Sequence, residues 1–311
     1  MKSHRILLAA PLLLLMLAGC SKNSDPTDPT SNSGTSQDQV ELTQQVTTQP
    51  DYAEDDGIAT SEEQVEASFA LSLAADLDVT AGSHPVRFWR VIRDIDRRFE
   101  FEFSDFDSAG NPNRAIVTVH KLLRGNFNVL YADSVGPDSV VRNLVHKPLE
   151  DRWVRKLVLH RMRLPNHVRS VWRIVGTSGV QVTSKDATTD IVSLRVQQGA
   201  LDTTITNPLE LFRLRQIIQL DTGADVTLTV TTTRADDIVL LYSRAGRARF
   251  HNNGDLTYSG TWRTASFAGL RHAGINALSH ATLFDPAAAY DSQAWILPYL
   301  VRPNDPGDFV E

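Results

Sequence analysis

The chain of 311 residues contains a single cysteine, Cys20, and only three methionines. A disulfide within the mature chain is therefore excluded, and so is a metal site built from cysteines. The patterns His-Glu-x-x-His and Gly-x-Ser-x-Gly do not occur, nor does a phosphate-binding loop or a dinucleotide-binding glycine pattern. These absences remove the commonest sequence signatures of hydrolases and nucleotide-binding enzymes, and we expect no cofactor.

A hydrophobic run long enough to cross a membrane is also missing. The longest apolar stretch follows Lys2 and Arg5 and covers roughly a dozen residues, whereas a bilayer core of about 30 Å requires about 20. Its length is typical of the hydrophobic region of a signal peptide. The next residues are Leu17-Ala18-Gly19-Cys20, and the arrangement resembles a bacterial lipoprotein signal peptide at residues 1–19. The resemblance implies cleavage before Cys20, diacylation of its sulfur and acylation of the new amino terminus.

This resemblance also indicates a partner and a location. Two or three acyl chains anchor a protein firmly, because each buried CH2 contributes about 0.8 kcal/mol. We therefore expect the membrane to be a partner through the lipid on Cys20, and the protein to lie in the cell envelope. Ser21 after the lipid-bearing cysteine implies the outer membrane in a Gram-negative host. An ordinary secretory signal with an incidental cysteine is the alternative, and nucleic acid is not an expected partner.

Large apolar side chains are scarce at residues 20–60, which are rich in Ser, Thr, Gln, Asp and Pro. Such a segment cannot bury enough surface to offset the entropy of ordering it, so we predict a disordered tether. Between Ser21 and Glu66 there are eleven acidic residues and one lysine. Without this span and the signal peptide, the chain has 28 basic and 26 acidic residues. The net charge of −6 therefore belongs to the tether.

One amphipathic helix is predicted at residues 61–78. Ser61-Glu62-Glu63-Gln64 has the pattern of a helix capping box. Apolar residues then follow at four-residue spacing: Val65, Phe69, Leu73 and Leu77. We expect this helix to dock on the folded body, because its polar face is acidic and disfavours binding to anionic lipid.

Beyond Gly82 the apolar residues alternate with polar ones, which predicts an all-β body. We expect a β-sandwich, either as two tandem Ig-like modules at 84–205 and 206–311 or as one large sandwich. Strands are predicted near 99–103, 115–123, 126–132, 168–175, 180–184, 191–196, 211–220, 226–230, 238–243, 256–262, 273–283 and 293–301. Asn253-Gly254 predicts a tight hairpin turn, because both residues tolerate a positive φ.

The stretch Asp151–Leu164 is ambiguous, because its apolar spacing suits a helix while a strand paired with 168–175 is nearly as plausible. It begins a span from Arg152 to Lys185 with eight Arg or Lys residues and no acidic residue. Such a span could bind envelope phosphates, an acidic partner or the chain's own tether. A solvated basic face is the alternative.

Residues 219–228 contain Asp221-Thr222-Gly223 and resemble the catalytic loop of retropepsin-type aspartic proteases. The resemblance implies a dimer in which Asp221 of each copy supplies one of two carboxylates that share a proton. Thr222 would buttress that loop, and Gly223 would allow close approach. Gln219, however, stands where the family has an apolar residue. We favour a turn between two strands, in which Gly223 supplies a positive φ.

Asp105, Asp107 and Gly110 fall at positions one, three and six of a calcium-binding loop. Ala109 offers no oxygen at position five, and Ile116 replaces the glutamate at position twelve. We therefore expect a plain turn and no metal.

Taken together, these patterns indicate a lipid-anchored cell-envelope protein whose β-sandwich body has a binding or structural role without catalysis. An envelope polymer or another protein is the expected partner besides the membrane. A retropepsin-like peptidase that dimerises through Asp221 is one alternative. A carrier that encloses an apolar ligand is the other.

Overall fold

A computed structural model describes residues 34–59, 64–65, 84–136, 139–163, 170–243 and 246–302. They belong to one compact unit, Ser33–Glu311. The signal peptide and Cys20 lie outside the described residues. So does the predicted helix at 61–78, except for Gln64–Val65, which form a short strand. Among the helices described, none is long and apolar enough to cross a membrane.

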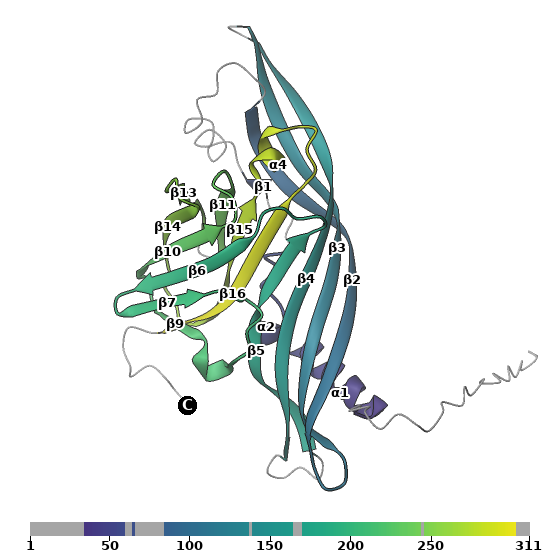
Figure 1. Cartoon of the computed structure of the whole chain (residues 1–311). Helices are drawn as coiled ribbons and strands as arrows, with labels where there is room; N and C mark the ends of the chain where they lie inside the picture. The colour runs from purple at the N-terminus through teal and green to yellow at the C-terminus, as the bar shows by residue number, and fades with distance from the viewer. Residues whose placement is uncertain are drawn as a thin grey trace, which may run out of the picture. The chain divides into compact units, whose positions relative to one another are not determined.

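Two sheets form the body, and the expected all-β fold preceded by a helix is confirmed (Figure 1), although the helix described, Ser36–Thr48, lies before the one predicted at 61–78. The larger sheet has the order β1-β2-β3-β4-β5-β16-β15-β11-β12, with β8 paired to β5 and β9 to β16. Its strands are β1 (Gln64–Val65), β2 (His84–Phe106), β3 (Pro112–Gly136), β4 (Ser139–Arg163), β5 (Ser170–Ser184), β8 (Phe212–Arg213), β9 (Ile218–Asp221), β11 (Ile238–Ser243), β12 (Gly246–Arg249), β15 (Gly269–Leu278) and β16 (Ser292–Arg302). The smaller sheet has the order β13-β14-β10-β6-β7, with β6 (Ile191–Gln198), β7 (Leu201–Ile205), β10 (Asp225–Thr232), β13 (His251–Asn252) and β14 (Thr257–Arg263).

The larger sheet joins both halves of the sequence. Strand β5, from the first predicted module, pairs with β16, the last strand described. The expected boundary between residues 205 and 206 therefore does not divide the described residues into two modules. The smaller sheet packs on β15 and β16 through a shared apolar core that includes Leu228, Tyr258 and Trp295. This part matches the alternative of one large sandwich.

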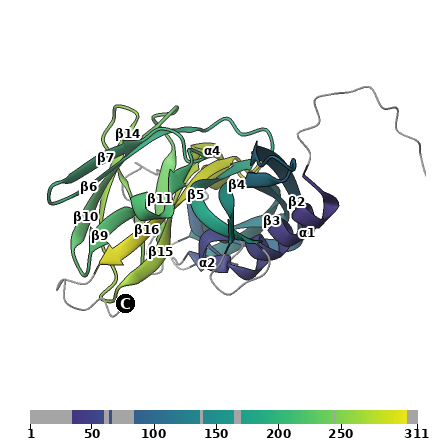
Figure 2. The ribbon, with the colours of Figure 1, turned by 90° about the horizontal axis from the view of Figure 1, so that it is seen from below.

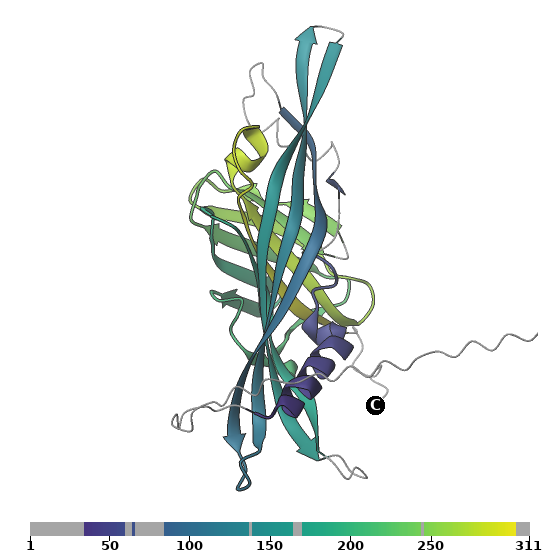
Figure 3. The same cartoon turned by 90° about the vertical axis from the view of Figure 1, so that its right-hand side faces the viewer.

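Strands β2, β3 and β4 are much longer than predicted, at 23, 25 and 25 residues (Figure 3). The two strands expected at 115–123 and 126–132 are one strand, because Gly125 does not end it. The β2–β3 register shifts opposite Gly125, and a Cβ there would lie 1.9 Å from the Val91 carbonyl oxygen. Glycine thus allows a close backbone approach rather than a turn. The ambiguous stretch at 151–164 is a strand as far as Arg163, paired with both β3 and β5.

Helices α1 (Ser36–Thr48) and α2 (Pro50–Ala53) lie beside the curve formed by β2–β5 (Figure 2). Leu42 and Val46 of α1 and Ala53 of α2 are buried in the same core as Val117 and Leu157 of the sheet. The prediction of disorder is therefore wrong for residues 34–59. Few apolar residues suffice here, because those present lie on one side of the segment and the sheet supplies partners for its acidic groups.

Candidate binding site

The face of β3, β4 and β5 that contacts α1 and α2 is aromatic and cationic. Residues paired across neighbouring strands point to the same face, and two such pairs join a cation to an indole ring. Lys121 pairs with Trp153, and its Nζ lies 4.1 Å from the ring centroid. Arg161 pairs with Trp172, and its Cζ lies 4.8 Å from the ring centroid. We call these two arrangements the Lys121–Trp153 clamp and the Arg161–Trp172 clamp.

The Arg161–Trp172 clamp holds the carboxylate of Asp38 at the start of α1. The Arg161 guanidinium forms an ion pair with Asp38 Oδ1, and Trp172 Nε1 donates to the same oxygen at 3.4 Å. The other oxygen, Oδ2, accepts from Thr35 N at 3.1 Å, while Thr35 Oγ1 accepts from Asp38 N at 3.2 Å. This capping box starts the helix. One buried carboxylate therefore both caps α1 and attaches it to the sheet.

The Lys121–Trp153 clamp holds the turn that follows α2. Trp153 Nε1 donates to Asp55 Oδ2 at 2.9 Å, and Lys121 forms an ion pair with Glu54. Asp55 also accepts from the backbone N–H groups of Gly57 and Ala59, at 3.1 and 3.2 Å. The segment is therefore fixed to the sheet near both of its ends, by carboxylates held on cation–indole pairs.

Two arginines bind the backbone of this turn. The Arg155 guanidinium donates to the Glu54 carbonyl oxygen and, through Nε, to Thr177 Oγ1 at 3.1 Å. Arg90 Nη2 donates to the Ile58 carbonyl oxygen at 2.9 Å. Burial lowers the pKa of Arg155 to about 10, although the nearby carboxylates of residues 54–56 raise it. Arg155 therefore remains charged at neutral pH and is neutralised mainly by the acidic segment.

Asp151 is a buried acid beside this site. Tyr290 OH donates to Asp151 Oδ2 at 3.2 Å, and Arg90 Nη1 lies 3.8 Å from the same oxygen. Burial raises the pKa of Asp151 to about 6, against the opposing effects of Arg90 and Tyr290. Among the described residues, no group of three or more His, Cys, Asp or Glu side chains could hold a metal ion. The geometry gives Asp151 a structural partner in Arg90.

Asp221 lies at the end of β9, in an exposed turn. Its carboxylate is 3.7 Å from Arg302 Nη2, and no hydrogen bond or ion pair joins it to another carboxylate within the described part of the chain. Gly223 has φ +62°, as a turn predicts. The turn is not a hairpin, however, because β9 lies in the larger sheet and β10 in the smaller one. The chain crosses between the sheets here, which local sequence does not reveal.

The two calcium candidates lie in and beside the β2–β3 turn. Asp107 Oδ1 accepts from the N–H groups of Ala109 and Asn111, at 2.9 and 2.8 Å. The hydrogen bonds from Asn111 are the main cause that lowers the pKa of Asp107. Asp105 and Gly110 have φ values of +57° and +79°. The Asp107 carboxylate thus binds the backbone of its own turn.

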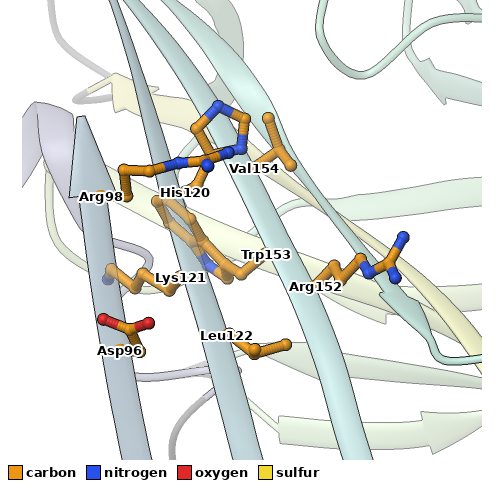
Figure 4. A pocket seen from close by; sticks show the side chains of 8 residues that line it. All are labelled: Asp96, Arg98, His120, Lys121, Leu122, Arg152, Trp153 and Val154. Carbon is orange, nitrogen blue, oxygen red and sulfur yellow. The ribbon is translucent and has the colours of Figure 1, made fainter. Parts of the chain in front are cut away.

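A hollow of about 270 Å³ is lined by residues of β2, β3 and β4; Figure 4 shows their side chains. Arg98, His120 and Val154 are paired across the three strands. Glu100 compensates two of the basic groups, because its carboxylate lies 3.1 Å from Arg98 and 3.2 Å from His120, and Asp96 also lines the hollow. Carboxylates therefore accompany the basic groups of this hollow.

The apolar space between the two sheets is small. It is bordered by residues such as Leu228, Ile275 and Leu297 and holds about 30 Å³, whereas ligand pockets measure about 300–1,000 Å³. That volume does not favour the apolar-carrier alternative.

Sequence reasoning missed both clamps and the acidic groups that they hold. One signal was present, since Thr35 and Asp38 stand three residues apart and are followed by Leu42 and Val46 at four-residue spacing. The sequence left three possible partners for the basic span at 152–185. Two of its residues, Arg155 and Arg161, contact one of these partners, the chain's own acidic segment.

Comparisons of the chain with protein-family models, curated proteins and solved structures found no match.

Proposed function

We propose that this protein is a lipid-anchored cell-envelope protein whose β body has a binding or structural role and no catalytic one. The observation that carries the proposal is the docking of residues 34–59, directly after the expected lipid-bearing region, onto the larger sheet. The chain from Cys20 to Gly34 spans at most about 50 Å, because each extended residue covers at most about 3.6 Å. A lipid on Cys20 would then hold the body close to the membrane.

The charged groups at this site are bound to one another or to the backbone, which supports a non-catalytic role. Glu54, Asp55 and Asp38 are bound by the clamps, and Arg155 by the segment's backbone. Catalytic acids and bases usually occur in clefts with substrate access and perturbed pKa values. The acidic groups here instead serve to attach one part of the chain to another. An envelope polymer or a protein remains the proposed partner of the surfaces left open.

Metabolic labelling with radioactive palmitate tests the anchor. We expect labelled, processed protein from the wild type and unlabelled precursor from Cys20→Ala, because the thiol is the acceptor of the lipid. Ser21→Asp is the matched control, since it leaves Cys20 in place and should keep the label. In a Gram-negative host it should also shift the protein from the outer to the inner membrane. Label that persists in Cys20→Ala would contradict the anchor.

A further inference from the structure

A second hollow, of about 690 Å³, lies on the face of the larger sheet that points away from α1 and α2. Its floor is formed by β3, β4 and β5, and its wall by the segment Leu211–Gln216. The strand register places Arg114 opposite His160 and His160 opposite Arg173. Because residues paired across neighbouring strands share a face, these three basic side chains form one row across the sheet, and Arg114 and His160 of this row line the hollow.

The wall stands close to the floor because of a glycine. β8 pairs with β5 at Gly176 and Thr177, and a Cβ on Gly176 would lie 2.8 Å from the Phe212 carbonyl oxygen. Gln216 Oε1 accepts from Arg213 N at 3.1 Å and fixes the bend of the wall. The arrangement brings Arg213 to the same hollow as Arg114 and His160.

The basic groups of this hollow lack acidic partners. Among the described residues, no carboxylate lines the hollow, and none forms an ion pair with His160, with Arg213 or with the neighbouring Arg173. Arg114 donates to a neutral group, Ser104 Oγ, at 3.2 Å. The hollow of Figure 4 is different, since Asp96 lines it and Glu100 lies beside its Arg98 and His120. An uncompensated group of two arginines and a histidine in a concave site attracts an anion.

The remaining lining is apolar and comes from Val158, Val175, Leu211 and Phe212. We propose that this hollow binds the phosphate group of a ligand, with Arg114 and Arg213 as the donors and the apolar lining in contact with the rest of the ligand. The planar guanidinium suits a phosphate because it can donate two parallel hydrogen bonds. The phosphate can belong to a lipid headgroup or be free. The site does not depend on the lipid anchor.

Isothermal titration calorimetry on the full chain with hexyl phosphate and inorganic phosphate tests the site. We expect Arg114→Gln/Arg213→Gln to weaken binding on the order of ten-fold or more, because hydrogen bonds from a charged guanidinium to a phosphate are stronger than those between neutral groups. Arg152→Gln is the matched control, since Arg152 is exposed on the same face of β4 but does not line this hollow. Its affinity should stay within about two-fold of the wild type.

The two probes distinguish the sources of the phosphate. Tighter binding of hexyl phosphate identifies an amphiphile such as a lipid headgroup, and equal affinities identify free phosphate; both support the site when binding depends on the two arginines. Arg213→Gln alone, in the exposed wall, replaces the double variant if that variant unfolds. Binding of neither probe, or equal losses in Arg152→Gln and the arginine variants, would overturn the proposal.

Discussion

Leu42→Ala tests whether residues 34–59 belong to the folded core. The Leu42 side chain is 0 % exposed and lies in the core shared by α1 and the larger sheet. Removing buried methyl groups from such a position costs about 2–5 kcal/mol, from lost burial and from the cavity left behind. We expect a loss of about 3 kcal/mol in the free energy of unfolding. This would be a large part of the total stability of a typical domain.

Val40→Ala on the same helix is the matched control. Val40 is 63 % exposed, so its truncation removes little packing, and alanine raises helix propensity by up to about 0.7 kcal/mol. Both variants can be followed by tryptophan fluorescence in guanidinium chloride, because Trp153 and Trp172 each donate to the segment. Equal unfolding midpoints for the two variants would refute the docking of α1.

Two further predictions concern carboxylates. Burial raises the pKa of Asp151 to about 6 in the folded protein, whereas the unfolded chain has a pKa of about 3.9. The folded state therefore binds the proton more tightly, and the wild type should lose stability relative to Asp151→Asn as pH rises from about 4 to 6. The expected loss is on the order of 1–3 kcal/mol, measured by urea unfolding of both proteins at pH 4 and pH 7.5, and parallel pH profiles would refute it. Asp221→Asn should change stability by less than about 0.5 kcal/mol, because its ion pair is exposed, and neither protein should cleave casein at acid pH. Pepstatin-sensitive cleavage by the wild type that is absent from the variant would instead establish the peptidase.

Local sequence predicted the shorter strands well. Residues 238–243 and 293–301 were expected as strands and correspond to β11 (Ile238–Ser243) and β16 (Ser292–Arg302). The Asn253-Gly254 turn joins β13 to β14, with φ +87° at Gly254. In each case alternation and turn chemistry act within a few residues, so the local pattern is sufficient.

Contacts between distant parts of the chain could not be predicted from the sequence. Gly125 has the properties of a strand breaker, yet it lies within β3, because β2 approaches too closely for a side chain. The low apolar content of residues 34–59 predicted disorder, although the sheet provides a buried face for a few apolar groups. The tryptophans of the clamps bind carboxylates far away in the sequence, since Asp55 and Trp153 are 98 positions apart and Asp38 and Trp172 are 134 apart. No periodicity within either segment specifies such a contact.

The site residues also divide into those that local sequence could place and those that it could not. Asp107 and Gly223 occupy turns, as their local spacing predicts, and Asp107 binds its own backbone. The Lys121–Trp153 clamp depends on which strands are neighbours, because Lys121 and Trp153 come from β3 and β4. The clamp could therefore not be located before the strand order was known. Cys20 lies outside the described residues, so its lipid remains a prediction.

Hydrogen exchange of the α1 amides in the full chain tests the central claim, that the two clamps hold residues 34–59 on the sheet. We predict that the amides of Leu42 and Val46 are protected nearly as strongly as those of β3. We also predict that Asp38→Ala/Asp55→Ala, which removes the carboxylate from each clamp, lowers this protection while that of the smaller sheet is retained. Wild-type α1 amides that exchange as fast as those of an unstructured peptide would contradict the account.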